Sequence, residues 1–184
     1  VGLPAGPSES IILADATTDP HIAAVDLLIE AEHGPDSCAL LVTDCEALAK
    51  KVAAEATALV KKLPEPRRSF CKSGFGKYGG IILTEGRKES ILFVNDFAPE
   101  HLEILLCEPF EALAQLKNAG EILVGPDTPI TLGNFNLGID AILPTGAFAR
   151  TFSGVSVYDF LKRSSIGYCT EEGLRALADT AQTL

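Results

Sequence analysis

The chain has 184 residues, of which 47% are hydrophobic and 22% are charged. This composition is typical of one folded globular domain, or of a domain with a small appendage. The formal net charge of −10 argues against partners such as nucleic acid or an anionic membrane surface, because a polyanion would be repelled. No apolar run approaches the roughly 18 residues that a membrane-spanning helix needs, and no segment resembles a signal peptide.

The five cysteines are widely spaced, odd in number and without a CxxC pair. This usage favours a reduced, cytoplasmic protein over a disulfide framework, with most of the cysteines acting as small core hydrophobes. The chain starts at Val1 and contains no Met. We therefore expect a processed product, an excised piece or a fragment of a longer protein.

In the first half of the chain, short apolar runs alternate with stretches of helical period. Thr43 and Glu46 form a capping-box pattern, which marks the start of a helix. Gly34-Pro35 ends the helix before it. The expected elements are strands at 10–14 and 39–42 and helices at 20–33 and 43–62.

The second half continues the alternation after a segment, Leu63 to Tyr78, that has no clear period and is interpreted as a linker or mobile loop. The elements expected beyond it are strands at 81–83 and 122–124, a possible edge strand at 104–106, and helices at 88–95 and 109–118. The alternation predicts an α/β layered domain over residues 1–150, with a largely parallel open sheet flanked by helices, resembling an incomplete Rossmann fold. Residues 151–184 are predicted to be a C-terminal helical extension of the same domain, with Thr170 capping its last helix.

The segment Ala98 to Glu103 places a carboxylate and an imidazole side by side, at Glu100 and His101. Pro99 disfavours a regular helix through this point, so we expect the pair on a bend between elements. Glutamate and imidazole are suited to moving protons near neutral pH. The alternative is an ordinary surface pair in a loop.

Three other segments compete for a ligand site, which in open α/β sheets lies outside the carboxyl ends of the strands. Gly6 to Glu9 is a small-residue loop in which Ser8 offers a hydroxyl. Glu30 and His33 are three residues apart, so both can face one metal ion, although a helix C-terminus also favours an imidazole for ordinary electrostatic reasons. Gly133 to Gly146 belongs to a glycine-punctuated loop of a length that is usually functional or mobile.

Two common nucleotide-binding patterns are absent from the sequence. There is no GxGxxG after a strand and no GxxxxGK[ST], so neither dinucleotide nor P-loop phosphate binding can be predicted from a motif. No Ser/His/Asp order stands out, and His21 is expected to be exposed at the start of the first helix.

Six short segments share their order and approximate spacing with one known family. They are Gly6-Pro7-Ser8-Glu9, Glu32-His33-Gly34-Pro35-Asp36-Ser37, Ala98-Pro99-Glu100-His101-Leu102-Glu103, Leu143-Pro144-Thr145-Gly146, Phe160-Leu161-Lys162-Arg163 and Glu172-Gly173-Leu174. Together they resemble the histidinol dehydrogenase family over essentially the whole chain. The resemblance corresponds to the middle-to-late part of a family chain roughly twice as long.

The resemblance implies an enzyme that oxidises L-histidinol to L-histidine by two successive hydride transfers to NAD. It implies that Glu100 activates the water attacking the aldehyde-level intermediate and that His101 is the general base for alcohol oxidation. It places Ser8 at a substrate-contacting position, and the substrate would also meet His101 and Asn134. The small-molecule alcohol would be bound in a homodimer with one zinc ion per site.

The metal site that the resemblance implies differs from the family pattern. His33 matches a zinc ligand, Glu30 stands where the family has a glutamine, and Asn134 replaces the aspartate of Gly-Asp-Tyr. The family's Asn-His before Leu-Pro-Thr becomes Asp140-Ala141, which removes an imidazole that lines the site. The remaining ligand comes from a C-terminal domain of the partner subunit, and the NAD contacts come from an N-terminal half; this chain has neither.

Three interpretations remain open on these grounds. The first is part of an NAD-dependent, histidinol-dehydrogenase-like oxidoreductase acting on a different alcohol, because Glu100 and His101 are kept while metal and substrate positions change. The second is a non-catalytic α/β domain of that family used as a folding or binding unit, which Asn134 and Ala141 favour. The third is a histidinol dehydrogenase of histidine biosynthesis.

Overall fold

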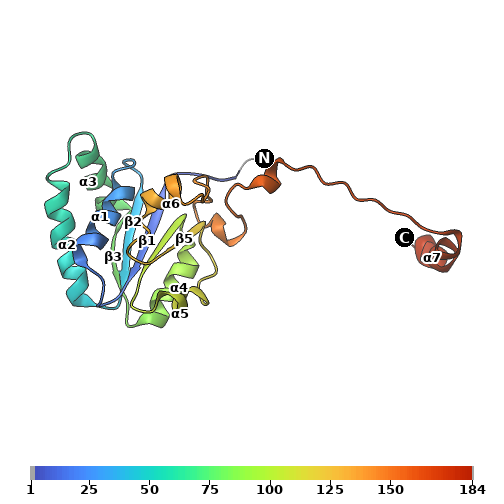
Figure 1. The fold of residues 1–184 in the computed structure, drawn as a ribbon, viewed down its shortest axis with the longest axis horizontal. Helices are drawn as coiled ribbons and strands as arrows, with labels where there is room; N and C mark the ends of the chain where they lie inside the picture. The colour runs from blue at the N-terminus through green and yellow to red at the C-terminus, as the bar shows by residue number, and fades with distance from the viewer. Residues whose placement is uncertain (1–2, 184) are drawn as a thin grey trace.

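A computed structural model describes residues 3–183, and its centre is a five-stranded sheet covered by helices on both faces (Figure 1). The strand order is β3-β2-β1-β4-β5, and every pair of neighbours is parallel. The strands are β1 (Glu9–Ala14), β2 (Cys38–Thr43), β3 (Gly80–Leu83), β4 (His101–Leu105) and β5 (Glu121–Val124). The predicted α/β fold with a parallel open sheet flanked by helices is therefore confirmed.

The helices lie in two groups on either side of the sheet. Figure 1 shows one group against each face. The first group is α1 (Pro20–Ala31), α2 (Glu46–Val60) and α3 (Arg67–Lys77), and the second is α4 (Arg87–Phe97) and α5 (Pro109–Leu113). A short helix, α6 (Ile130–Asn136), follows β5 and contacts α1.

Alternate residues of each strand face opposite sides of the sheet, so they fill two separate cores. On the α1 side, Ile12 and Leu105 pack against apolar residues of α1 and α2. On the α4 side, Ile11, Leu102 and Ile104 pack against α4 and α5. Burying each such side chain stabilises the fold by about 1.5–3 kcal/mol, so both faces of the sheet contribute to stability.

The segment expected to be a linker contains a helix instead. Helix α3 occupies most of residues 63–78, so that prediction was wrong. Only Cys71 and Gly74 of this helix are buried, which explains why its sequence carries no apolar period. Gly74 allows α3 to approach the loop between α1 and β2 closely, because an added Cβ would lie 3.1 Å from the carbonyl oxygen of Ser37.

The sequence had suggested a possible edge strand at 104–106, but strand β4 of the structure does not lie at an edge of the sheet. It lies between β1 and β5 and begins at His101, so the Glu100-His101 pair stands at the entrance to a central strand. Charged and apolar residues alternate in His101 to Leu105, a pattern typical of a strand with one exposed face. In the structure, all five residues are buried.

Several boundaries also differ from the predicted ones. The capping box at the start of α2 does not form, because the Thr43 hydroxyl accepts a hydrogen bond from the Cys45 N–H, and Cys45 makes no side-chain cap. Helix α5 ends at Leu113, earlier than expected. Of the five cysteines, Cys71 is buried in the α1-side core, Cys45 and Cys38 are half-buried against the two cores, and Cys107 and Cys169 are exposed.

No residue between 151 and 183 is buried, and this segment runs away from the sheet in Figure 1. It ends in α7 (Glu171–Thr183), where the Thr170 hydroxyl accepts a hydrogen bond from the Gly173 N–H and confirms the predicted cap. The division between residues 150 and 151 remains a prediction. Within residues 3–183, no helix is long and apolar enough to cross a membrane.

Candidate active site

The sequence-predicted site residues gather at the amino ends of the strands, not at the carboxyl ends where we had expected a ligand site. Glu9, His101 and Glu121 are the first residues of β1, β4 and β5. Helix α1 runs antiparallel to the strands and therefore ends at the same edge, where it places Glu30. The chemistry-bearing groups thus meet at the edge opposite to the usual one.

The carboxyl ends of β1 and β4 are tied together by the chain itself. The Asp15 carboxylate accepts hydrogen bonds from the Cys107 N–H at 2.9 Å and from the Arg87 guanidinium at 3.1 Å. It also accepts bonds from the backbone and hydroxyl of Thr17, and these contacts hold its pKa below the ordinary value despite partial burial. Internal hydrogen bonds therefore satisfy the polar groups at this end.

The imidazole of His101 is the centre of the site. Its Nδ1 lies 2.5 Å from Oε1 of Glu121, and both side chains are almost completely buried. Its Nε2 lies 3.7 Å from Oε1 of Glu100 and 3.9 Å from Oε2 of Glu30. One ring nitrogen is thus hydrogen-bonded, while the other faces two carboxylates beyond hydrogen-bond distance.

Backbone contacts fix Glu100 and the loops around it. The Glu9 N–H donates to Oε2 of Glu100 at 3.0 Å, and Oε1 of Glu9 accepts a bond from the Gly146 N–H at 3.0 Å. The Thr145 hydroxyl donates to the carbonyl of Gly6. The Gly6–Glu9 loop, the Glu100-His101 pair and the Leu143–Gly146 segment, which are far apart in sequence, therefore form one structure.

Glu30 joins this group from the last turn of α1, and its side chain is only 3% exposed. Burial, with the charges of Glu100 and Glu9, raises its pKa to about 7 against the attraction of His101. The Ser8 hydroxyl lies close enough to stabilise the charged form of Glu30. The structure thus brings Ser8, Glu30, Glu100 and His101 together.

The electrostatics of the cluster suit proton transfer near neutral pH. Burial raises the pKa of Glu100, an effect that the nearby His101 and the Glu9 N–H oppose. Burial alone would lower the pKa of His101, but the hydrogen bond to Glu121 and the charges of Glu100, Glu121 and Glu30 outweigh it, so this pKa is raised. Such groups can act as acid or base without a large energetic penalty.

The three residues suggested as metal ligands differ in how deeply they are buried. Glu30 is buried, Asn134 lies half-buried on α6, and His33 is exposed just after α1, with its charge acting on Glu100. One side-chain oxygen each of Glu30 and Asn134 is buried without a hydrogen-bond partner, and such oxygens suit a cation. Within residues 3–183, however, no three His, Cys, Asp or Glu side chains converge as a ligand set, so the donors fit zinc only as part of an incomplete site.

A second buried acidic pair, Asp26 and Glu103, lies next to the cluster on the same side of the sheet. Asp26 is one helical turn before Glu30, and Glu103 is two residues after His101. Burial, together with the neighbouring Asp26, raises the pKa of Glu103 to about 9. Burial also raises the pKa of Asp26. Among the described residues, no Lys or Arg nitrogen lies within 4.0 Å of an oxygen of either carboxyl group, so neither group has a basic ion-pair partner.

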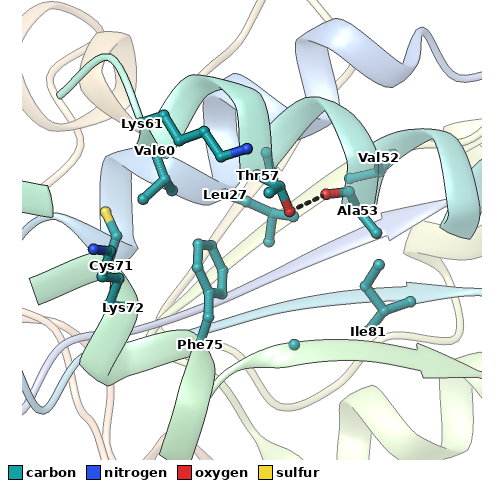
Figure 2. Close-up of a pocket in the computed structure, with 12 residues that line it drawn as sticks. Leu27, Val52, Ala53, Thr57, Val60, Lys61, Cys71, Lys72, Phe75 and Ile81 are labelled. Carbon is teal, nitrogen blue, oxygen red and sulfur yellow. Dashed lines mark hydrogen bonds between the residues drawn. The ribbon is translucent and has the colours of Figure 1, made fainter. Parts of the chain in front are cut away.

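A separate apolar pocket of about 350 Å³ opens between α2, α3 and β3 (Figure 2). Val52, Val60, Phe75 and Ile81 line it, and no residue of the His101 cluster does. Burial raises the pKa of its Cys71 thiol to about 11, so this sulfur stays protonated and a poor nucleophile near neutral pH. The pocket offers apolar surface but, unlike the His101 cluster, no acid–base pair.

Two members of the cluster, Glu9 and Glu121, were not singled out from the sequence. Their signal was available in part, since each is an acid directly before an expected strand. What was missing was the register, in which Ser10, His101 and Glu121 are direct neighbours across β1, β4 and β5. His21, by contrast, is exposed as expected and pairs with Glu55.

A buried imidazole among carboxylates in a parallel α/β domain is an arrangement that can support acid–base chemistry, and the comparisons show the family of the chain. The model of the family described as histidinol dehydrogenase matches residues 1–184. A histidinol dehydrogenase of Synechocystis sp. is 54% identical over 184 residues, which are 100% of this chain and 42% of that protein. The histidinol dehydrogenase homolog 2 of Mesorhizobium japonicum is 52% identical over 184 residues, which are again 100% of this chain and 42% of that protein.

The fold of a solved structure agrees with this assignment. A crystal structure of histidinol dehydrogenase from Elizabethkingia anophelis has a TM-score of 0.89 and 30% identity, covering 98% of this chain and 41% of that one. The chain therefore belongs to the histidinol dehydrogenase family, as the motifs had suggested. It spans about two fifths of the length of these relatives.

Proposed function

We propose that a full-length protein containing this chain is an NAD-dependent, histidinol-dehydrogenase-like oxidoreductase acting on an amino alcohol or a related alcohol. The observation that carries the proposal is the position of His101, whose Nε2 faces Glu100 and Glu30 across gaps of 3.7 and 3.9 Å. A substrate hydroxyl between these groups would have a base for its proton on one side and a carboxylate on the other. L-Histidinol is the first substrate to test.

In this proposal His101 accepts the hydroxyl proton of the alcohol at Nε2. Glu100 then accepts a proton from the water that attacks the aldehyde-level carbon, and its fixed bond from the Glu9 N–H keeps one carboxylate oxygen in place. Ser8 and Asn134 would contact the substrate. NAD, held by residues outside this chain, would supply the two-electron acceptor for each oxidation.

Zinc would be held by Glu30, His33 and Asn134, with a further donor from outside the 184 residues. The ion would orient the nitrogen groups of the substrate and polarise the reacting centre. We further propose that the full-length protein is a cytoplasmic homodimer. The unpartnered oxygens of Glu30 and Asn134 support a cation site.

Two experiments test the proposal. The full-length protein is assayed for NAD reduction with L-histidinol and with a panel of other amino alcohols. Turnover of one of them is expected, and no turnover of any alcohol would reject the dehydrogenase. Separately, the 184-residue chain is equilibrated with zinc and desalted, with His33→Ala as control; zinc retained by the wild type and lost in the variant supports the ligand set, and no zinc in either means that the site needs its missing donor.

A second candidate is a non-catalytic folding or binding unit. The replacement of the family's aspartate by Asn134, together with the absence of a converging ligand set in the described part of the chain, favours it. The same assay distinguishes the two candidates, because a non-catalytic domain would give no turnover while the full-length protein remained folded.

A further inference from the structure

Glu121 is the closest ionic neighbour of His101 and has no role in the function proposed above. The two residues are direct partners in the register of β4 and β5, so their side chains leave the sheet side by side. Oε1 of Glu121 and Nδ1 of His101 are 2.5 Å apart, and the side chains are 2% and 5% exposed. In this buried setting the hydrogen bond is not weakened by competing water.

The backbone holds Glu121 rigidly against the catalytic pair. The Glu121 N–H donates to the carbonyl of Glu100 at 2.9 Å, and the Gly120 N–H donates to the carbonyl of Pro99 at 2.9 Å. Gly120 is needed for this approach, because an added Cβ would lie 2.6 Å from the Glu100 carbonyl oxygen. The carboxylate is therefore fixed relative to Glu100 as well as to His101.

Helix α6 closes the other side of Glu121. An added Cβ at Gly133 would lie 2.8 Å from a Leu123 methyl carbon and 3.5 Å from Oε2 of Glu121. The glycine thus lets α6 pack directly over the carboxylate. This packing gives the Glu121 side chain little freedom to turn away from the imidazole.

We propose that Glu121 is a positioning residue, whose carboxylate accepts the Nδ1–H of His101 and so orients the ring with Nε2 facing Glu100 and Glu30. The proposal rests on the proposed function in assigning proton acceptance to Nε2, but the hydrogen bond itself does not depend on that function. A neutral imidazole carries one proton, and a carboxylate at Nδ1 selects the form in which Nε2 has the free lone pair. When the ring takes up a second proton, the same carboxylate stabilises the cation.

The first test is nitrogen-15 NMR of the three histidine rings in the 184-residue chain, compared between wild type, Glu121→Gln and Glu121→Leu. At a pH at which the ring is neutral, we expect His101 to carry its proton on Nδ1, with a proton resonance far downfield. This resonance should move upfield in Glu121→Gln and disappear in Glu121→Leu, while His21 and His33 keep their signals. A wild-type ring protonated on Nε2, or a His101 spectrum unchanged in folded Glu121→Gln, would overturn the proposal.

The second test is the kinetics of the full-length protein carrying Glu121→Gln or Glu121→Asp. Because orientation acts on the proton-transfer step, we expect Glu121→Gln to lower kcat by about 100-fold with little change in KM, and Glu121→Asp to restore part of that loss. Glu108→Gln, at an exposed carboxylate, should match the wild type. A kcat within twofold of wild type in Glu121→Gln would reject the positioning role, whereas an inactive wild type would reject the proposed function and leave the NMR result to decide on the hydrogen bond.

Discussion

The two faces of the sheet are built from the same strands but have different interiors. On the α4 side, the buried residues of β1 and β4 are Ile11, Leu13, Leu102 and Ile104, all apolar. On the α1 side, Ser10, His101 and Glu103 alternate with them, and Asp26 and Glu30 of α1 face the same interior.

This difference has an energetic meaning. An apolar interior stabilises the fold in proportion to its buried area, whereas buried carboxyl groups cost free energy unless they are paired or protonated. Several oxygens on the α1 side, including both of Glu103 and the Ser10 hydroxyl, have no hydrogen-bond partner. Both sides have an apolar core that stabilises the fold, but the α1 side gives up part of this stability to hold the buried polar groups.

The largest change in stability should come from the apolar face. Replacing Ile104, which is 0% exposed, with Ala removes packing from the centre of that core and should lower the free energy of unfolding by about 2–5 kcal/mol. Leu92→Ala, at a side chain that is 60% exposed on α4, is the matched control and should cost about 0.5 kcal/mol or less. Equal losses in urea denaturation would show that burial of Ile104 in the α4-side core does not stabilise the fold.

A smaller and pH-dependent effect is expected at Glu103. Its pKa is raised from 4.5 to about 9 in the folded chain, so the folded state keeps a proton that the unfolded chain loses across this range. The free energy of unfolding should therefore fall as pH rises through this window. In Glu103→Gln the fall should be shallower, while Glu108→Gln should follow the wild type. If the slopes of Glu103→Gln and wild type coincide, Glu103 does not hold a proton in the folded chain.

The smallest expected changes in the free energy of unfolding come from two serine hydroxyls, one without a hydrogen-bond partner and one with a partner. The Ser10 hydroxyl is buried without a partner, so Ser10→Ala should leave the free energy of unfolding within about 0.5 kcal/mol of wild type or raise it. The Ser90 hydroxyl lies 2.7 Å from that of Thr84 on the other side of the molecule, so Ser90→Ala should cost about 1 kcal/mol. A larger loss for Ser10→Ala than for Ser90→Ala would mean that Ser10 has a stabilising partner.

The sequence predicts the elements with a clear apolar pattern better than those without one. Apolar runs such as Ile11 to Leu13 and the amphipathic period of α1 were sufficient to predict strands and helices correctly. The central place of β4 was not predictable, because His101 and Glu103 give it the alternation of a half-exposed strand. Helix α3 was missed because it buries too few residues to show a period.

The site was predictable only in its local motifs. Glu100-His101 stands out because two acid–base groups are adjacent, and the loops at Ser8 and Thr145 stand out by composition. Glu9 and Glu121 join the cluster through strand register and through hydrogen bonds between distant segments, which a single sequence does not specify. The expected ligand edge was wrong for the same reason, since the strand order and the position of α1 decide which edge holds the polar groups.

The most direct measurement is the turnover of the full-length protein carrying Glu100→Gln, alongside the unfolding free energy of the 184-residue chain with the same change. Gln can still accept the bond from the Glu9 N–H but cannot act as a base, so turnover should fall by about 10²–10⁴-fold while stability changes little. Turnover equal to that of the wild type would contradict the assignment of the chemistry to the carboxylates around His101.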